Sequence, residues 1–403
     1  MQFSVLLPTH DRLEYLRFAV QSVLRQDCPD WEIVISDNDS SEDVAGYARS
    51  VGDSRIRYVR TAGFVPVTVN WNNALRHSSG DYVVMLGDDD ALLPGYLSGL
   101  RDVIESFGGP DAVYTGAYLF AYPGVLPDLP EGYLQPNLHG PFFAGHERPF
   151  ILPVTQAREL ARAAASFRAL YDFNMQYVLL SRHTIQTLAG DGEFFRSPYP
   201  DYYAMNLLFA RAERIVVDPQ PRVVIGITRR SYGFFHFNGK SADARALLNT
   251  EDVDPAIRQD LASVVLPGAD MNTSWLLAVE SLYRRLGSPA EMRPDYSRYR
   301  HLQALHCMRA YYVDRSMARE QVRLAQATLP PVQRLLVRSL GPLTGALLRH
   351  VPDRVRQAYG ALVDRLVGQY GHVVTPTREL GRYATVLAVL DHFEPTVDPA
   401  ARA

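Results

Sequence analysis

The sequence predicts an α/β fold in which a mostly parallel sheet lies between helices and a helical C-terminal extension follows. Two observations predict it. Over the first hundred residues, short apolar runs alternate with segments of helical periodicity, an order typical of parallel sheets covered by helices. From about residue 249 onward the apolar spacing is helical. We therefore expect two domains, residues 1–248 and residues 249–403.

The individual elements follow from the period of the apolar residues. A short apolar run predicts a strand, and a period near 3.6 predicts a helix. In the first hundred residues we expect strands over 3–7, 33–35, 56–59 and 82–86, separated by helices over 13–24, 44–51 and 67–75. Farther along we expect a stretch of little periodicity at 118–150, a helix ending at 212, strands at 214–217 and 223–227, and helices over 271–286, 299–324, 331–350 and 352–370.

Composition excludes several classes of function. The net charge of −3 over 403 residues gives no basic field for nucleic acid. Cys28 and Cys307 are too few for a disulfide framework or a zinc cluster, and they fit a reducing cytoplasm. No apolar run approaches the roughly 20 residues that span a bilayer, and we expect no signal segment before the first strand.

Three consecutive carboxylates, Asp88, Asp89 and Asp90, follow the apolar run that ends at Leu86. Adjacent carboxylates repel one another, and they become favourable when a cation lies among them. A divalent metal that bridges to a phosphate is a common cation at the end of a buried strand. The alternative is a solvated acidic turn or a helix N-terminus, where the helix dipole favours negative charge.

Polar residues gather directly after three of the predicted strands. Residues 8–12, 36–41 and 87–90 are each rich in Asp or Thr. Ligands of open α/β sheets bind beyond the carboxyl ends of the strands. The sequence therefore predicts a ligand site at this edge of the sheet.

Four runs of residues, taken in order and at their spacing, carry a resemblance to a known family. They are Ser4-Val5-Leu6-Leu7-Pro8-Thr9-His10-Asp11-Arg12, residues 31–40, Asn70-Trp71-Asn72-Asn73-Ala74-Leu75, and residues 80–90 with Pro94-Gly95. Together they resemble the family 2 glycosyltransferases of the GT-A fold. The resemblance implies a nucleotide-diphospho-sugar donor, a divalent Mn or Mg ion held by an Asp-x-Asp element, and transfer with inversion at the anomeric carbon.

The resemblance also implies roles for individual residues of the donor site. Asp90 is the first choice for the metal ligand, Asp89 is the alternate ligand, and Asp88 would face the ribose or a metal-bound water. The nucleoside and the rest of the donor would be held by Pro8, Thr9, Arg12, Asp37, Asn38, Asp39 and Asn70. Many relatives carry a second acid at the position of Asn38. The Asn therefore leaves the identity of the nucleobase in the donor undecided. Arg12 is equally well explained as a surface arginine at a helix start.

An inverting transfer also needs a carboxylate that takes the proton of the acceptor hydroxyl. Asp201 stands after Pro198 and Pro200 at the start of a predicted helix, where relatives place this base. The alternative is a helix N-cap, which stabilises by about 1 kcal/mol without any reaction. Asp191 and Glu193 lie just upstream and are the fallback candidates.

Basic residues follow the predicted base. The resemblance implies that Arg229 or Arg230 pairs with phosphate oxygens and that His236 supplies a metal ligand or a phosphate hydrogen bond. The alternative is an aromatic loop packed on the core, with its arginines in solvent.

The sequence thus predicts a metal-dependent inverting glycosyltransferase of glycan, glycolipid or glycosylated-metabolite biosynthesis. Its acceptor would be a saccharide, a lipid-linked saccharide or a small molecule. The expected location is the cytoplasm or the inner face of the cell membrane. Membrane contact and self-association through the C-terminal helices are both open. The alternatives are a catalytically idle nucleotide-sugar binding protein of the same fold and a nucleotidyltransferase, although residues 8–12 contain no glycine for a phosphate loop.

Overall fold

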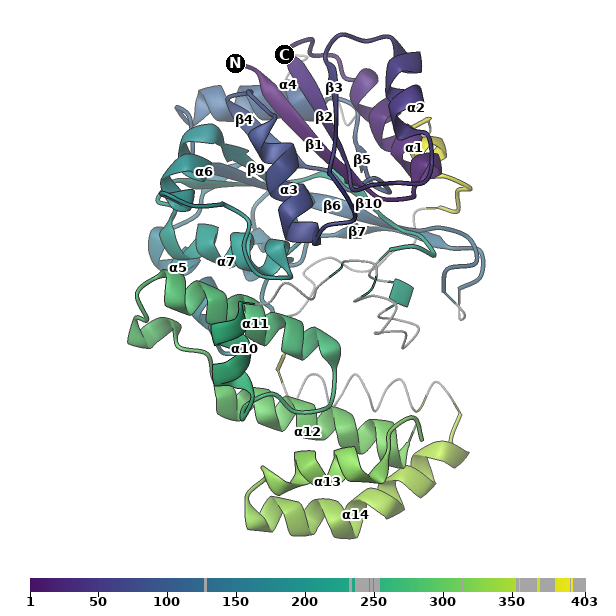
Figure 1. Ribbon diagram of the computed structural model, residues 1–403, viewed down its shortest axis with the longest axis vertical. Coiled ribbons are helices and arrows are strands. Elements are labelled where there is room, and N and C mark those ends of the chain that lie inside the picture. Colours follow the sequence, from purple (N-terminus) through teal and green to yellow (C-terminus); the bar gives the residue numbers. More distant parts are fainter. Residues whose placement is uncertain are drawn as a thin grey trace. The chain divides into compact units, whose positions relative to one another are not determined.

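The computed structural model (Figure 1) describes residues 1–126, 129–231, 234–235, 246, 249, 254–313, 315–352, 355, 368–369, 381–391 and 393. The chain forms two compact units. The first comprises Met1–Arg158, Tyr171–Asp252 and His372–Ala403, and the second comprises Glu159–Leu170 and Val253–Gly371. The predicted division into domains at residue 248 stays a prediction.

Ten strands of the described residues form one sheet in the first unit. They are β1 Phe3–Thr9, β2 Trp31–Asp37, β3 Ile56–Arg60, β4 Tyr82–Met85, β5 Ala91–Leu92, β6 Ala112–Ala121, β7 Tyr133–Asn137, β8 Phe150–Ile151, β9 Val178–Ser181 and β10 Ile215–Ile227. Their order is β3-β2-β1-β4-β9-β6-β10-β5, with β7 paired to β6 and β8 paired to β10.

The strand directions divide the sheet into two parts. β1 to β4 run parallel to one another, whereas β9 lies antiparallel between β4 and β6. The predicted α/β fold class and the helical C-terminal region are confirmed. The sheet differs in one respect: it is mixed rather than mostly parallel, because β5, β7, β8 and β9 pair in the antiparallel sense.

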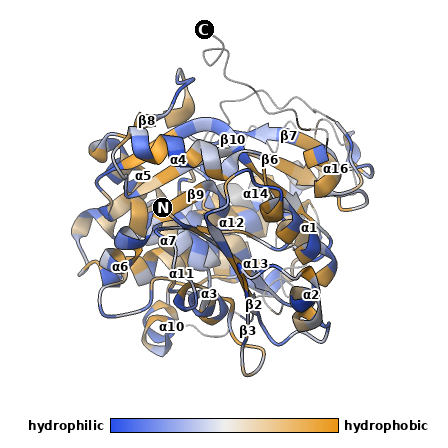
Figure 2. Ribbon diagram, turned by 90° about the horizontal axis from the view of Figure 1, so that it is seen from above, coloured by the Kyte–Doolittle hydropathy of each residue, from blue (hydrophilic) through white to orange (hydrophobic). Residues whose placement is uncertain are grey.

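Helices lie between and after these strands along the chain. They are α1 Leu13–Leu24, α2 Val44–Val51, α3 Val67–Arg76, α4 Tyr96–Ser106, α5 Val154–Ala165, α6 Arg182–Ala189, α7 Pro200–Arg211 and α16 Val386–Asp391, with the 3-10 turns η1 Pro141–Phe143 and η2 Met175–Tyr177. α1 packs on β1 and β5, and α3 packs on β1 and β2. Blue and orange segments alternate along these helices in Figure 2, as expected of helices with one buried face.

Local sequence fixes the ends of α2. The carboxylate of Asp43 accepts a hydrogen bond from the backbone N–H of Gly46 at 2.7 Å, which satisfies a donor that the first helical turn leaves unpaired. Gly52 ends the helix in the left-handed region at φ 71°. An N-cap acid and a C-terminal glycine are the usual signals of helix limits, and the predicted bounds of α2 are confirmed.

The prediction of little regular structure over residues 118–150 is wrong. β6 continues to Ala121, and β7 pairs with it antiparallel. The buried ring of Tyr114 has edge contacts with Phe142, and it stacks on Tyr177 at 5.7 Å between centroids. Aromatic side chains of this stretch thus fill the core, which explains their number in the sequence.

The second unit is helical in its described residues. It contains α10 Pro255–Leu261, α11 Asp270–Arg285, η3 Ala290–Met292, α12 Tyr296–Tyr312, α13 Arg319–Ala327 and α14 Pro331–His350. The single helix predicted over 299–324 is wrong: α12 ends at Tyr312, and Arg315 adopts a left-handed φ of 54°, which a continuous helix does not allow. The helix predicted over 352–370 falls mostly outside the described residues. Among the described helices, none has the length and apolar character needed to cross a membrane.

The chain returns to the first unit near its C-terminus. Val386, Val389 and Leu390 of α16 are buried in one apolar cluster with Phe120 and Tyr122. Outside this cluster, Arg25 of α1 forms an ion pair with Asp391 at 2.6 Å. Residues 386–391 therefore complete a core whose other members come from β6 and neighbouring segments of the first unit.

Candidate functional site

The acidic triplet follows β4 at the carboxyl edge of the sheet. Leu86 continues the pairing by donating its N–H to the carbonyl of Leu6, and the chain then turns before β5 begins. Asp88, Asp89 and Asp90 are only 2, 7 and 2% exposed. The triplet is therefore a buried cluster of charge, and the alternative of a solvated acidic turn does not describe it.

Arg12 supplies a cation to this cluster from the loop after β1. Its Nη1 lies 2.9 Å from Asp88 Oδ1, and its Nη2 contacts Asp89 Oδ2. Thr9, the last residue of β1, donates its hydroxyl to the other oxygen of Asp88 at 2.8 Å. The two parallel strands thus bring Thr9, Arg12, Asp88 and Asp89 together, as the sequence predicts for residues that follow neighbouring strands. Arg12 is not the surface arginine of the alternative reading.

Asp89 also accepts hydrogen bonds from the hydroxyl groups of a segment far along the chain. Ser231 donates its hydroxyl to Asp89 Oδ2, and Thr228 lies 3.4 Å from the same oxygen. Both residues follow β10, about 140 positions along the chain. This part of the site had no sequence signal, because the same segment stands out for its arginines and not for its hydroxyls.

Asp90 accepts hydrogen bonds from a different set of groups. Its Oδ1 accepts the backbone N–H of Gly226 at 2.8 Å, and its Oδ2 accepts Gln176 Nε2 at 2.7 Å and the N–H of Gly87 at 3.1 Å. Both oxygens of the predicted metal ligand thus hold β4, β10 and η2 together. Gln176 and Gly226 lie in no recognisable motif, so sequence reasoning missed them.

Burial sets the electrostatics of the cluster. It raises the pKa of Asp88, which the charge of Arg12 and the hydroxyl of Thr9 lower in part. Burial raises the pKa of Asp90 as well, and the neighbouring charge of Asp89 adds to this effect. The carboxylates in turn raise the pKa of the Arg12 guanidinium despite its own burial. One guanidinium thus offsets only part of the charge of three carboxylates.

The oxygens of the cluster decide how a metal could be held. Among the residues that the structure describes, no group of three or more His, Cys, Asp or Glu side chains is placed to hold a metal ion. Asp89 Oδ1 is the oxygen of the triplet that accepts no hydrogen bond from the described residues, since the contacts of Asp89 use Oδ2. A site with one protein oxygen fits Mg²⁺, which often takes one or two carboxylates and completes its shell with substrate phosphates and water.

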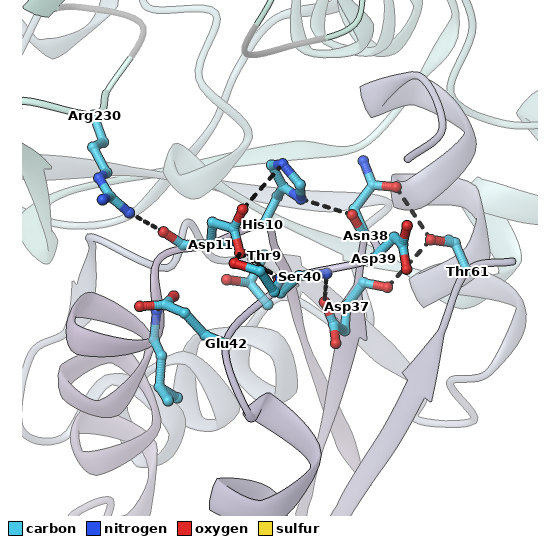
Figure 3. Close-up of polar contacts among 12 residues, drawn as sticks. Thr9, His10, Asp11, Asp37, Asn38, Asp39, Ser40, Glu42, Thr61 and Arg230 are labelled. Carbon is cyan, nitrogen blue, oxygen red and sulfur yellow. Dashed lines mark hydrogen bonds and ion pairs between the residues drawn. The ribbon is translucent and has the colours of Figure 1, made fainter. Parts of the chain in front are cut away.

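The predicted nucleoside loop follows β2 (Figure 3). Asp37 is fully buried and accepts a hydrogen bond from the Tyr58 hydroxyl at 2.7 Å. It also accepts the backbone N–H of Ser40 at 2.8 Å, as Figure 3 shows. The amide of Asn38 exchanges two hydrogen bonds with the backbone of Val65, at 2.8 and 2.9 Å. Both side chains therefore shape the loop through contacts with the protein itself.

Asp39 differs from its two neighbours. Its side chain is 42% exposed and pairs with Arg60 at 2.6 Å, and its φ of 60° is left-handed. Beside it, His10 contacts the carbonyl of Asn38 through Nδ1 at 2.7 Å and stacks on Phe64 at 4.3 Å between ring centroids. The loops after β1 and β2 thus meet, and the carboxylate of Asp39 faces solvent, as do those of Asp11 and Asp43 in the same loops.

Two further residues that were predicted to bind the nucleotide-sugar donor both lie next to Ser36 of β2. Asn70 of α3 is buried, and its amide oxygen accepts the hydroxyl of Ser36 at 2.7 Å. Pro8 pairs in register with the same Ser36 across β1 and β2. The contacts of Asn70 fix α3 to β2, a structural role that the sequence motif did not indicate.

The predicted phosphate-binding arginines are exposed. Arg230 donates to the backbone carbonyl of Asp11, which joins the segment after β10 to the loop after β1 (Figure 3). Arg229 lies beside Gly124. His236, the other predicted metal ligand, lies outside the described residues.

Asp201 lies in the first turn of α7. Tyr199 is the N-cap residue and makes no side-chain cap hydrogen bond, while the carboxylate of Asp201 accepts the first-turn N–H of Tyr202 at 2.8 Å. Asp201 thus satisfies a donor at the helix start from inside the first turn and not from the N-cap position. Asp201 is partly buried, and burial raises its pKa to about 6. The fallback candidates Asp191 and Glu193 are exposed, and Glu193 pairs with Arg76 at 2.7 Å. Among these acids, Asp201 has the environment that favours a proton acceptor near neutral pH.

A short turn connects the triplet with α7. η2 contacts both β4 and α7, and its Gln176 is the residue that donates to Asp90. In α7, Asn206 accepts the hydroxyl of buried Tyr171 at 2.8 Å. The elements that carry the triplet and Asp201 are thus packed around the same turn.

Comparison with known proteins gives a match for the region that holds most of these residues. Residues 4–148 match the sequence model of the family described as Glycosyl transferase family 2. The GalNAc(5)-diNAcBac-PP-undecaprenol beta-1,3-glucosyltransferase of Campylobacter jejuni is 38% identical over 102 residues, which are 25% of this chain and 33% of that protein. The UDP-Glc:alpha-D-GlcNAc-diphosphoundecaprenol beta-1,3-glucosyltransferase WfgD of Escherichia coli is 28% identical over 87 residues, 22% of this chain and 34% of that protein.

The chain therefore matches about one third of the length of these two relatives. Among solved structures, residues 1–349 of S. aureus TarS in complex with UDP-GlcNAc are 14% identical, with 81% of this chain and 90% of that chain covered at a TM-score of 0.43. The matched residues 4–148 include Thr9, Arg12 and the triplet.

Proposed function

We propose that this protein is an inverting glycosyltransferase that moves a sugar from a nucleotide-diphospho-sugar to an acceptor hydroxyl. One observation carries the proposal: within the region similar to glycosyltransferases, Thr9, Arg12, Asp88 and Asp89 form one buried contact network at the carboxyl edge of the sheet. This edge is where open α/β sheets bind their ligands. Asp39 and the exposed Arg230 border the same loops and are proposed to contact the nucleoside and the diphosphate.

The diphosphate leaving group gains charge as the bond to the anomeric carbon breaks. A divalent Mn or Mg ion would neutralise that charge as a Lewis acid. We assign its protein ligand to Asp89, whose Oδ1 is available, and not to Asp90, whose two oxygens each accept N–H donors. Arg12 would offset part of the negative charge of the triplet with or without the metal, since it contacts both Asp88 and Asp89.

Asp201 is the proposed general base. Its carboxylate would accept the proton of the acceptor hydroxyl while the oxygen attacks the anomeric carbon from the face opposite the diphosphate. The new C–O bond forms as the bond to the diphosphate breaks, so the configuration inverts. A pKa of about 6 leaves the carboxylate ionised at neutral pH and still basic enough to take the proton.

The acceptor is proposed to be a lipid-linked saccharide. Two relatives carry names that describe transfer to diphosphoundecaprenol-linked sugars. Because the match covers about a third of each relative, the acceptor depends on parts of the chain outside it. Contact with a membrane surface from the cytoplasmic side would bring such an acceptor to the site.

Thermal unfolding of the purified protein with nucleoside diphosphates and nucleotide sugars tests the donor proposal. We expect one nucleotide to raise the midpoint, more strongly with Mn²⁺ than with chelator, because a ligand of the folded state stabilises it by mass action. Asp89→Asn should remove the metal-dependent part of the rise, whereas Asp102→Asn, an exposed acid on α4, should leave it unchanged. No rise with any nucleotide would contradict the donor proposal. A rise without sugar transfer to any acceptor would indicate an idle binding protein.

A further inference from the structure

One helix of the second unit exposes a row of large apolar side chains. Val332, Leu335, Leu340, Leu343 and Leu347 of α14 are 70, 66, 54, 68 and 66% exposed. At about 100° per residue these five positions fall within an arc of roughly 140° on one side of the helix. We call these five residues the apolar face of α14. They are the most exposed leucines and valines of the described residues, apart from Leu324 at 55%.

The opposite side of α14 is packed. Leu348 is buried, and a Cβ at Gly341 would meet the ring of Tyr312 at 2.6 Å. At Gly345 a Cβ would meet the carbonyl oxygen of Tyr312 at 2.4 Å. The two glycines therefore let α14 approach the end of α12 closely. The helix is anchored through one face, and its apolar face points away from that contact.

The charge of α14 has one sign. The helix contains Arg334, Arg338 and Arg349 and no Asp or Glu. Arg334 is held at the end of α13, where it donates to the carbonyls of Ala327 and Leu329 at 2.7 and 3.0 Å. Arg338 is exposed. An apolar face on a helix that carries only cations is typical of segments that lie in the interface of an anionic membrane.

We propose that the apolar face of α14 docks on an anionic lipid surface. Leu335, Leu343 and their neighbours would enter the boundary between headgroups and acyl chains, while the arginines attract the anionic headgroups over about a Debye length. A second copy of this chain is the weaker partner, because α14 has no acid that could pair with the exposed Arg338 of another copy, whereas anionic headgroups can. The proposal concerns how the protein reaches a membrane and is independent of which donor the first unit binds.

Binding of the full chain to lipid vesicles tests the proposal. We expect cosedimentation with vesicles that contain phosphatidylglycerol, weaker cosedimentation with pure phosphatidylcholine, and a decrease in binding as salt rises. Leu343→Glu and Leu335→Glu should each lower the vesicle partition coefficient about tenfold, because each removes a leucine from the apolar face that would enter the membrane. The control is Ile151→Glu on β8, which changes a 48% exposed apolar residue of the first unit and should bind as the wild type does.

Three results would overturn the proposal. They are no binding of the wild type to phosphatidylglycerol vesicles, equal binding of the α14 variants and the wild type, and a dimer in light scattering that Leu343→Glu dissociates. The last result would make the face a contact between copies. Circular dichroism and the nucleotide-induced thermal shift of each variant report folding and donor binding separately. A failure of vesicle binding with an intact thermal shift therefore counts against the lipid surface and leaves the proposed function standing.

Discussion

Nη1 of Arg12 lies 2.9 Å from Oδ1 of Asp88, with both side chains largely removed from solvent. The second terminal nitrogen of the guanidinium contacts Asp89. Three adjacent acids therefore have a counter-ion that the chain itself provides, three residues after β1 ends. Arg12 thus supplies part of the counter-charge of the folded triplet, and any metal that binds with the donor would add to a cluster whose charge is already partly balanced.

The first prediction concerns this counter-ion. Removing one partner of a buried ion pair leaves an unpaired buried charge, so we expect Arg12→Ala to lower the free energy of unfolding by about 3–5 kcal/mol at pH 8. The loss should be smaller at pH 5. Without Arg12 the pKa values of the carboxyls in the folded protein rise further. A carboxyl whose pKa is raised in the folded state makes the protein less stable as pH increases through that pKa.

Urea unfolding at the two pH values measures the effect, with Arg12→Lys as the conservative variant. Lysine keeps the charge but not the two-pronged contact with Asp88 and Asp89, so its loss should be intermediate. An equal loss for Arg12→Ala at pH 5 and pH 8 would show that the destabilisation does not come from the buried charges.

The second prediction concerns Asp201. Asp201→Asn keeps the shape of the side chain and removes the proton acceptor, so transfer should slow by about 10²–10⁴-fold while the donor-induced thermal shift stays near that of the wild type. Turnover is measured with the donor that the thermal screen identifies, and Asp102→Asn is the matched control. Comparable turnover of the Asp201 variant and the wild type would point to another base, with Asp191 as the next candidate.

The third prediction concerns pH. Burial raises the pKa of Asp201 to about 6, and a general base works only when it is ionised. We therefore expect kcat/KM to fall tenfold per pH unit below a midpoint near pH 6. The raised folded pKa also means that Asp201 favours the folded state most below its ordinary value of 3.8, and that this contribution is lost as pH rises through about 6. In Asp201→Asn the residual rate should lack the limb at pH 6, and a limb that persists would assign it to another group.

The fourth prediction concerns Gly226, which donates to Asp90. A Cβ at this position would lie 2.0 Å from the carbonyl oxygen of Asp89, a backbone atom that cannot move without displacing the triplet. We expect Gly226→Ala to destabilise the protein by about 1–3 kcal/mol and to weaken the donor-induced thermal shift. Gly63→Ala is the control, since a Cβ at Gly63 meets no atom within 4 Å. Thermal unfolding of both variants decides, and equal midpoints would contradict the predicted clash.

The elements that sequence predicts well are those whose signals are local. The bounds of α1 and α2 agree with the apolar period because each helix buries one stripe and ends at local signals such as Gly52. The break between α12 and α13 was missed because the left-handed Arg315 leaves no trace in the apolar period. The strand β9 was not predicted, and its antiparallel place between β4 and β6 depends on partners far along the chain.

The candidate site divides in the same way. Thr9, Arg12 and the triplet could be placed together because they follow strands that parallel topology makes neighbours. Gln176, Gly226, Thr228 and Ser231 could not, because they reach the triplet through tertiary contacts across 86 to 142 positions. The sequence also assigned ligand roles to Asp37 and Asn38, whose hydrogen bonds the fold uses to shape its own loop.

The burial of α16 in the first unit bears on how this chain is made and how it can be shortened. Ribosomal synthesis delivers Phe120 and Tyr122 more than 250 residues before Val386, which packs with them. This side of the first core therefore stays open to water until the helical second unit has been translated. For the same reason, cutting the chain back before α16 would expose these rings.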